Sequence, residues 1–524
     1  MSARRTGAVV EVRPGAYHDS VTLMQVSRRL REVPGVRAAQ VAMGTPLNLE
    51  LLDGMGLTAP PGTGPDDLVL AMDVEDDAAR ERALAALADA LAPSAGSGGG
   101  GGAGEQPPLT TGSALRRHPA GLVVVSVPGE AAFAEALDAV QAGVSVLLFS
   151  DNVPMEQELA LKRLAAERDV LVMGPDCGTA VVGGLGLGFA NVVRPGPVSL
   201  VAASGTGAQQ VMSLLDAAGV GVRHCLGLGG RDLSAAVGGR SASQALRALA
   251  ADAGTELVVL VSKPPDDEVA RRLRDEAAEL GLPVAEALLG ADRPDLTAAV
   301  EYALARLPRP VPRWPHWPAA PDDGTHGGRR RTAGGVIRGL FCGGTLCDEA
   351  MLVVSDALGD AGSPTPVRSN IPLRPDWRLA VDGSGIWDAG ADHAMVDFGD
   401  DALTRGRAHP MIDPTLRDAR LEAEARDPRV GVLLLDVVLG HGAHPDPASE
   451  LAPRVRQARS LAAADGRDLA VVVTLVGTAG DPQGRDAQAE ALAAAGADVF
   501  ASNAHAARHA VRLVRAAERE EASR

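Results

Sequence analysis

Residues 198–219 read VSLVAASGTGAQQVMSLLDAAG, and residues 336–359 read VIRGLFCGGTLCDEAMLVVSDALG. Each stretch begins with a short apolar run, passes through Gly-Thr, and continues as an amphipathic segment that ends at Gly. The apolar run predicts a buried strand, and the helical spacing of apolar residues after it predicts an amphipathic helix. The two stretches therefore predict two copies of one strand–turn–helix unit.

Three further strands are expected after each of these units, in the same order. Chance similarity between two ordinary strand–helix repeats is the alternative, but the shared order and spacing of four strands favour an internal duplication. Continuous Val and Leu runs that alternate with helices are typical of a parallel sheet buried on both faces. The later strands begin near His224, Leu257 and Leu282 in the first copy, and near His393, Val430 and Leu469 in the second.

Two segments of unusual composition divide the chain. Residues 93–108 read PSAGSGGGGGAGEQPP, and residues 308–334 are rich in Pro. Both are typical of inter-domain joints, and they account for part of the 61 Gly and 36 Pro among 524 residues. We therefore expect four domains: a small α+β domain at 1–92, a Rossmann-like domain at 109–193, and two α/β units at 194–307 and 335–524.

Composition excludes several classes of partner. The net charge of −17 argues against binding to nucleic acid or to an anionic membrane, both of which need a basic face. No apolar run approaches the roughly 18 residues of a spanning helix, and the first residues lack the apolar core of a signal peptide. Four cysteines without metal-ligand spacing predict neither a metal site nor a disulfide scaffold, so we expect a cytoplasmic protein. Lys162 and Lys263 are the only lysines, which we attribute to coding bias.

The turn Ser204-Gly205-Thr206 lies between the first strand and the first helix of the duplicated unit. At this position backbone N–H groups point outward and the helix dipole favours an anion, which predicts phosphate binding. The alternative, a simple helix N-cap, is equally favoured when this copy is considered alone, because Ser and Thr are common there. The counterpart in the second copy is Gly343–Thr345.

Gly440, His441 and Gly442 follow the third strand of the second copy. Open α/β sheets bind ligands at the carboxyl ends of their strands, so the two glycines are predicted to bind phosphate. His441 is a candidate for proton transfer. A flexible turn with a surface histidine is the alternative.

A polar loop at residues 407–414, RAHPMIDP, follows the second strand of that copy. Arg407 is suited to pair with a carboxylate or phosphate. His409 is a candidate base or nucleophile, with Asp413 close in sequence. A plain loop with Asp413 as an N-cap is nearly as well supported.

The turn Gly174-Pro175-Asp176-Cys177 follows the third strand of the Rossmann-like segment. Its exposed amides suit a phosphate or the carbonyl of pantetheine. Cys177 is a candidate reactive thiol, but a small packing residue is the commoner role of a lone cysteine. The sequence has no GxGxxG after a strand, no GxxxxGK[ST], no HExxH and no GxSxG, so nicotinamide, P-loop and serine-hydrolase functions lose their main support.

At these residues the chain resembles a known family. Residues 161–180, LKRLAAERDVLVMGPDCGTA, resemble the end of the CoA-binding domain of the succinyl-CoA synthetase α subunit, and residues 196–233 resemble the ligase domain that follows it. The second copy resembles the carboxy-terminal ligase domain of the β subunit. The fused order, with SVPGE, LLFSDNVP, GGRDL, VSKPP and HPMIDP, resembles most closely the FdrA family of acyl-CoA-synthetase-like proteins, over about residues 110–515.

The resemblance implies a Rossmann-like CoA-binding domain followed by two flavodoxin-like ligase domains. In the synthetases two helix N-termini face a phosphate, and the corresponding positions here are Ser204–Thr206 and Gly440–Gly442. His409 or His441 would accept the phosphoryl group or transfer a proton. Coenzyme A would bind at Gly174, Pro175, Asp176 and Cys177.

The chain also departs from the synthetases. The stretch LLGADRPDL at 288–296 contains no His where the α subunit carries its phosphorylated one, and no ATP-grasp domain is visible. We therefore do not expect ATP to bind this chain alone.

Three functions follow from the resemblance. The first is an acyl-CoA synthetase (succinate–CoA ligase)-like acyl transfer through a bound phosphate. The second is that of an FdrA-type subunit of an oxamate carbamoyltransferase, which makes oxamate and carbamoyl phosphate from oxalurate and phosphate in allantoin catabolism. The third is a non-catalytic scaffold that binds CoA or phosphate. The enzymatic functions take a small acyl or carbamoyl substrate and require partner subunits.

Overall fold

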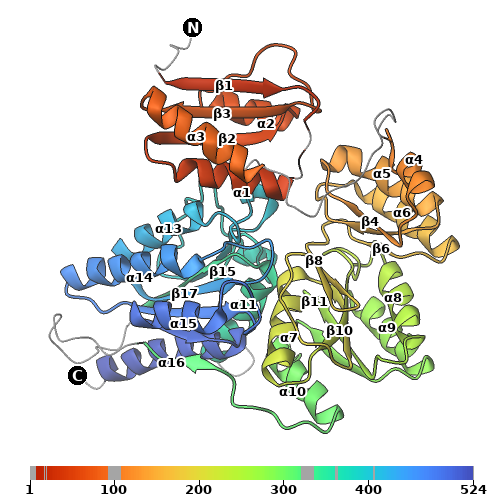
Figure 1. Cartoon of the computed structure of the whole chain (residues 1–524). Helices are drawn as coiled ribbons and strands as arrows, with labels where there is room; N and C mark the ends of the chain where they lie inside the picture. Colours follow the sequence, from red (N-terminus) through yellow and green to blue (C-terminus); the bar gives the residue numbers. More distant parts are fainter. Residues whose placement is uncertain are drawn as a thin grey trace. The chain divides into compact units, whose positions relative to one another are not determined.

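The computed structural model describes residues 7–16, 18, 20–91, 108–319, 335–359, 364–404 and 408–522 (Figure 1). Most of the expected linker at 93–108, and residues 320–334 of the Pro-rich stretch, lie outside the described residues. The chain divides into two compact units, Met1–Ala114 with Thr404–Ala408, and Leu115–Leu403 with His409–Arg524.

The first unit contains a three-stranded antiparallel sheet with the order β1-β3-β2, as expected for a small α+β domain. Helices α1 and α3 pack on one face of this sheet and α2 packs on the other. We did not predict α2, although Thr45 caps it and Pro begins it, which is a usual signal for a helix start. The elements are β1 (Ala8–Arg13), α1 (Ser20–Arg31), β2 (Val36–Met43), α2 (Pro46–Gly54), β3 (Leu68–Val74) and α3 (Asp77–Ala90).

The second unit begins with a short parallel sheet of order β4-β5-β6. Its apolar strands pack against α5 and α6, which agrees with the Rossmann-like expectation. The helix α4 (Thr111–Arg117) precedes this sheet. The other elements are β4 (Leu122–Val125), α5 (Gly129–Gln141), β5 (Ser145–Leu148), α6 (Met155–Glu167) and β6 (Val172–Met173).

The predicted duplication is confirmed by strand order. The first copy has the order β12-β11-β9-β10 and the second has β18-β17-β14-β16, all parallel, so both run 4-3-1-2 in chain order. With β19 beside β18, the second copy has the flavodoxin-like order, whose ligand crevice lies between strands 1 and 3. The strands are β9 (Val198–Ala203), β10 (Val222–Gly227), β11 (Leu257–Ser262), β12 (Val284–Leu288), β14 (Val336–Phe341), β16 (His393–Asp397), β17 (Val430–Val438), β18 (Ala470–Val476) and β19 (Ala497–Phe500).

Four short strands extend these two sheets, and the sequence did not predict them. The hairpin of β7 (Thr179–Val182) and β8 (Leu185–Gly188) pairs antiparallel with β10. This hairpin therefore belongs to the sheet of the first copy, although it precedes the expected domain boundary at 193/194. In the other copy, β13 (His316–Trp317) pairs with β19 and β15 (Val367–Arg368) pairs with β16.

The two copies share one hydrophobic core. It contains apolar residues of α7 and α10 from the first copy and of α11 and α16 from the second. None of the described helices is long and apolar enough to cross a membrane. The helices of the two copies are α7 (Gly205–Ala217), α8 (Arg240–Ala250), α9 (Asp267–Glu279), α10 (Leu296–Arg306), α11 (Gly344–Leu358), α12 (Asp401–Thr404), α13 (Thr415–Arg426), α14 (Pro447–Ala464), α15 (Arg485–Ala494) and α16 (Asn503–Ala522).

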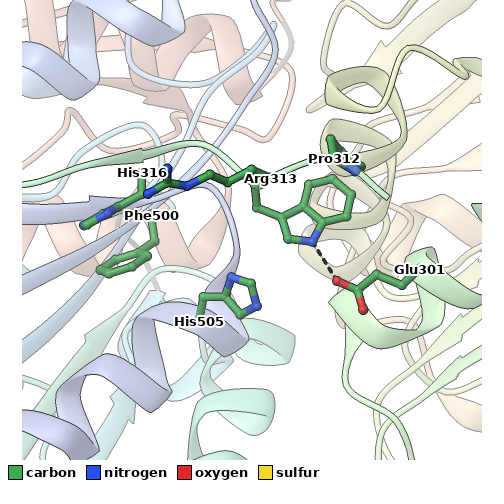
Figure 2. A pocket seen from close by; sticks show the side chains of 7 residues that line it. Glu301, Pro312, Arg313, His316, Phe500 and His505 are labelled. Carbon is green, nitrogen blue, oxygen red and sulfur yellow. Dashed lines mark hydrogen bonds between the residues drawn. The ribbon is translucent and has the colours of Figure 1, made fainter. Parts of the chain in front are cut away.

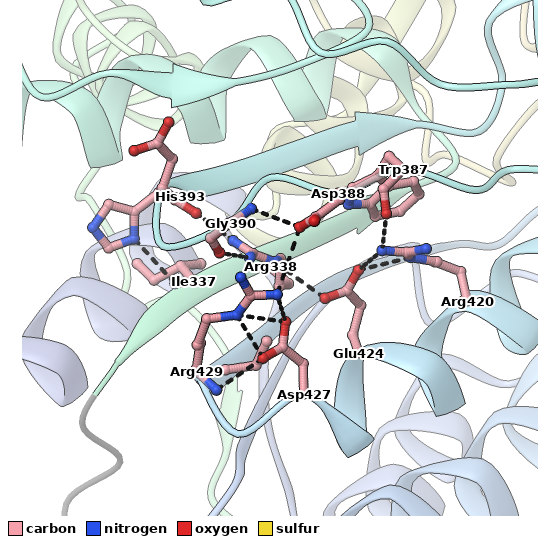
Figure 3. A network of polar contacts seen from close by, with 12 residues as sticks. Ile337, Arg338, Trp387, Asp388, Gly390, His393, Arg420, Glu424, Asp427 and Arg429 are labelled. Atoms are coloured by element: carbon pink, nitrogen blue, oxygen red, sulfur yellow. Dashed lines mark hydrogen bonds and ion pairs between the residues drawn. The ribbon is translucent and has the colours of Figure 1, made fainter.

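A buried polar network holds the central strand of the second copy (Figure 3). Arg338 on β14 is only 1% exposed, and its Nε donates to Glu424 Oε2 on α13 over 3.1 Å. It also donates to the carbonyl oxygen of Gly390 over 2.7 Å, in the loop before β16. On α13, the guanidinium of Arg420 lies 3.7 Å from the centre of the Trp387 ring. Because these contacts satisfy a buried charge, they tie β14, α13 and that loop together.

A second buried ion cluster joins the Rossmann-like domain to the first copy. Lys162 on α6 is fully buried, with Nζ 2.9 Å from Glu158 Oε1 and 2.7 Å from Asp232 Oδ1. The same ammonium donates to the carbonyl oxygen of Leu228 over 3.2 Å. Asp232 in turn accepts from the backbone amides of Ser241 and Ala242 at the start of α8.

We predict that Lys162→Met destabilises the second unit by about 3–5 kcal/mol, because it leaves Asp232 buried without a cation. Urea unfolding would measure the change. The matched control is Arg271→Met, which removes an exposed cation from α9 and should cost less than about 1 kcal/mol. Equal unfolding midpoints for the two variants would contradict a structural role for this cluster.

Candidate functional site

The N-termini of α7 and α11 meet at the predicted Ser204 turn. Ser204 Oγ accepts from the backbone amide of Gly207 over 3.0 Å. Ser204 is therefore the N-cap of α7, as the N-cap alternative for this turn predicted. The same oxygen lies 2.6 Å from Thr345 Oγ1, in the first turn of α11. No side chain among the described residues caps α11. Two helix N-termini therefore present their partial positive charges at one place.

Glycine is required where these helix ends approach their neighbours. A Cβ added to Gly343 would lie 2.7 Å from Thr206 Oγ1. A Cβ added to Gly344 would lie 2.6 Å from Asp397 Oδ2 and 2.7 Å from Lys263 Nζ. Because real Cβ atoms do not come that close, any side chain at Gly344 would displace Lys263 or Asp397.

Lys263, Asp397 and Asp348 surround the start of α11. Lys263 directly follows β11, Asp397 ends β16, and Asp348 lies in the second turn of α11. Burial raises the pKa of Asp397 to about 7 and that of Asp348 to about 6. Burial lowers the pKa of Lys263, but the carboxylates of Asp348 and Asp397 outweigh it, so the net pKa of Lys263 rises. Lys263 is therefore an ammonium at neutral pH.

The predicted CoA-binding turn contributes Asp176 to the same electrostatic environment. The Asp176 residue is exposed to solvent on one side, and protein atoms surround its carboxyl group on the other sides. The resulting desolvation raises the pKa of Asp176 to about 6. Its charge acts on Lys263. Cys177 is buried, and burial raises the pKa of its thiol to about 12, which favours the packing role over a reactive one. Gly174 and Pro175 share a cis peptide bond and pack against Gly229.

His409 lies beside Asp397. Its Nε2 and Asp397 Oδ1 lie 2.7 and 3.1 Å from the position that a Cβ on Gly399 would take. Its Nδ1 accepts from the backbone amide of Met411 over 3.3 Å, which places the ring proton on Nε2. Burial lowers the pKa of His409 to about 4, so the ring is neutral at pH 7. The ring centre lies 5.9 Å from that of Phe189.

The expectation that Gly440–Gly442 lie at a helix N-terminus is wrong. They form a loop between β17 and α14, which begins only at Pro447, and the helix that faces α7 is α11. The amide of His441 donates to the carbonyl oxygen of Ala190 over 2.8 Å, and the His441 side chain is exposed. A Cβ on Gly442 would lie 3.0 Å from the Phe189 ring, which also contacts His409.

Two other residues were predicted in the loop at 407–414. Arg407 lies outside the described residues. Asp413 Oδ1 accepts from the amide of Thr415 at the start of α13, which agrees with the capping alternative.

Sequence reasoning missed Lys263, Asp348 and Asp397. The available signal was the scarcity of lysine, which we attributed to coding bias. In the structure both lysines of the chain lie near carboxylates.

A separate cavity of about 390 Å³ contains none of the predicted site residues (Figure 2). Trp314 Nε1 donates to Glu301 Oε1 over 2.8 Å there, and the His316 ring stacks on Phe500 with centres 4.1 Å apart. Its lining residues are Glu301, Pro312, Arg313, Trp314, His316, Phe500 and His505.

Two family models match the chain. Residues 340–513 match the CoA-ligase model, and residues 6–108 match the model named AllF, heavy metal-associated domain. The uncharacterized protein YahF of Escherichia coli K12 is 38% identical over 509 residues, which cover 94% of this chain and 96% of that protein. The chain belongs to the FdrA family of acyl-CoA-synthetase-like proteins.

More distant relatives of this FdrA-family chain match over shorter stretches. Subunit alpha 2 of the ADP-forming succinate–CoA ligase of Archaeoglobus fulgidus is 29% identical over 163 residues, which cover 30% of this chain and 55% of that subunit. A dinucleotide-forming acetyl-coenzyme A synthetase of Candidatus Korarchaeum cryptofilum, solved with phosphate and ADP, is 15% identical over 76% of this chain and 84% of that chain. The TM-score of this pair is 0.27. No metal-binding group of His, Cys, Asp and Glu occurs in the described part of the chain, and residues 6–108 contain no cysteine.

We predict that Gly344→Ala destabilises the second unit, although alanine normally stabilises a helix relative to glycine by about 1 kcal/mol. The added Cβ must displace Asp397 or Lys263. Gly383→Ala is the control, because nothing lies within 4 Å of a Cβ there. A midpoint of urea unfolding for Gly344→Ala equal to or above that of Gly383→Ala would show that the close approach does not exist.

We also predict that His409 stays neutral down to about pH 5. The pKa of His409 is about 4 in the folded protein and about 6.5 in an unfolded chain, so the unfolded chain binds the proton more readily. The free energy of unfolding therefore decreases as the pH falls below 6.5. Proton NMR of the ring, assigned with His409→Gln, measures this value. Titration near pH 6.5 would contradict the burial of the ring.

Proposed function

We propose that this FdrA-family chain transfers an acyl group to or from phosphate, at the place where the N-termini of α7 and α11 meet. The observation that carries the proposal is the 2.6 Å contact between Ser204 and Thr345, which brings the two helix ends together. Backbone amides in two first turns, with the hydroxyl of Thr206 and the one proton that the Ser204–Thr345 pair does not share, supply donors for anionic oxygens. Such preorganised donors stabilise charge that develops during acyl transfer.

The surrounding groups support a reaction at this place. The chain carries a net charge of −17, so an anionic reactant needs a local positive site. The helix ends and the ammonium of Lys263 provide one. His409, with its proton on Nε2, is the candidate for proton transfer, and His441 lies exposed in the neighbouring loop. We further propose that the turn Gly174–Cys177 binds the pantetheine end of coenzyme A, and that the chain works with partner subunits.

A carbamoyl group is the second candidate substrate. The match of residues 6–108 to a domain model named after AllF favours it, because the FdrA resemblance links such proteins to oxamate carbamoyltransferase. The two candidates need the same phosphate site, since each forms a mixed anhydride of phosphate. They differ in the leaving group, which is the thiol of CoA in one and oxamate in the other.

Hydroxylamine trapping tests both candidates in one assay, because it converts acyl and carbamoyl phosphates to stable products. The protein, with its co-expressed neighbours, would be incubated with phosphate and either succinyl-CoA or oxalurate. We expect a phosphate-dependent product with one of the two. Phosphate binding without turnover in any mixture would overturn both catalytic functions. It would support the third function, a non-catalytic scaffold that binds phosphate.

We predict that Thr206→Val lowers the rate of product formation at least tenfold, because it removes a hydroxyl from the site without changing the shape of the side chain. Thr58→Val, in the first unit, removes an exposed hydroxyl and should leave the rate unchanged. Equal rates for the two variants would place the reaction elsewhere.

A further inference from the structure

The two lysines of the chain have different surroundings. Among 50 Lys and Arg residues, only Lys162 and Lys263 are lysines. Lys162 is fully buried, and its ammonium contacts two carboxylates and a carbonyl oxygen. Lys263 is only partly buried, and its ammonium makes no hydrogen bond or ion pair within 4 Å among the described residues. Lys162 therefore has the contacts of a structural lysine, whereas the three donors of Lys263 remain available.

The position of Lys263 points these donors at the proposed site. It follows β11, which is strand 3 of the first copy and the neighbour of strand 1, so it lies at the crevice of the flavodoxin-like order. Its Nζ lies 2.7 Å from the position that a Cβ on Gly344 would take, at the first residue of α11. Strand 1 itself leads into Ser204 and α7. Lys263 therefore lies between the end of β11 in the first copy and the start of α11 in the second.

The carboxylates around Lys263 explain how a cation is kept there. Asp348 and Asp397 are nearly buried, and with Asp176 they act on the ammonium. Their negative charge favours the ammonium form of Lys263.

We propose that Lys263 is a catalytic residue that binds the oxygens of phosphate or of an acyl phosphate in front of α7 and α11, and that Asp348 and Asp397 are positioning residues that hold its ammonium. This inference rests on the proposed function and deepens it. The substrate class is a phosphate dianion or its acyl ester, and Lys263 acts as a fixed charge that forms no covalent bond.

Calorimetry with inorganic phosphate tests the inference without any activity. We expect wild-type protein to bind phosphate, and Lys263→Met to bind it at least tenfold more weakly, because a charge-assisted hydrogen bond is lost. Arg271→Met removes an exposed cation from the following helix and should bind as the wild type does. Wild-type protein that binds no phosphate would overturn the proposed function. Lys263→Met that binds as tightly as the wild type would overturn this inference alone.

Amine labelling of the wild-type protein, with and without phosphate, is a second readout. Because Lys162 is fully buried, acetylation of native protein at pH 9 should modify Lys263 and the amino terminus, and mass spectrometry distinguishes them. We expect phosphate to protect Lys263 and leave the amino terminus unprotected. Asp397→Asn should shift the pH profile of Lys263 labelling to lower pH, which a merely structural aspartate would not do. Labelling of Lys263 that phosphate does not slow would contradict the inference.

Discussion

The packing of α7 and α10 against α11 and α16 is the interaction on which the site depends. These helices come from the two copies of the duplicated unit and bury one continuous core of Val, Leu, Ala and Met side chains. Burial of apolar surface supplies most of the free energy that holds such copies together. Because α7 and α11 each follow the first strand of a copy, their packing brings equivalent N-termini into contact. The site that we propose therefore lies between the two copies.

The proposed site contains positively charged groups, whereas the whole chain has a negative net charge. A protein with a net charge of −17 concentrates two helix N-termini and one ammonium at a single place. Burial raises the pKa of Asp397 to about 7 and that of Asp348 to about 6, so both carboxyl groups still carry negative charge near neutral pH. The same carboxylates keep Lys263 charged. Titratable groups with shifted pKa values thus gather around the start of α11, which is why we propose this place as the site.

Local sequence was sufficient for the four main strands of each copy, the duplication and the Ser204 turn, since apolar runs and helix starts depend on neighbouring residues. It was insufficient for the partner of that turn, because the loop that meets α7 is decided by how two sheets pack. Gly440–Gly442 have the right residues at a strand end, yet Gly343–Thr345 are the residues that face α7. Lys263 and Asp397 lie 134 positions apart and meet only through the same packing. Hairpin β7–β8 was missed because each of its strands has only four residues and β8 alternates Leu with Gly.

The most direct test of this account is a crystal structure of the full chain grown with tungstate, whose anomalous scattering locates a phosphate-like anion. The account predicts tungsten within hydrogen-bonding reach of Lys263 Nζ and of the first-turn amides of α7 and α11. Strong anomalous density at other positions, with none in front of these two helices, would contradict it.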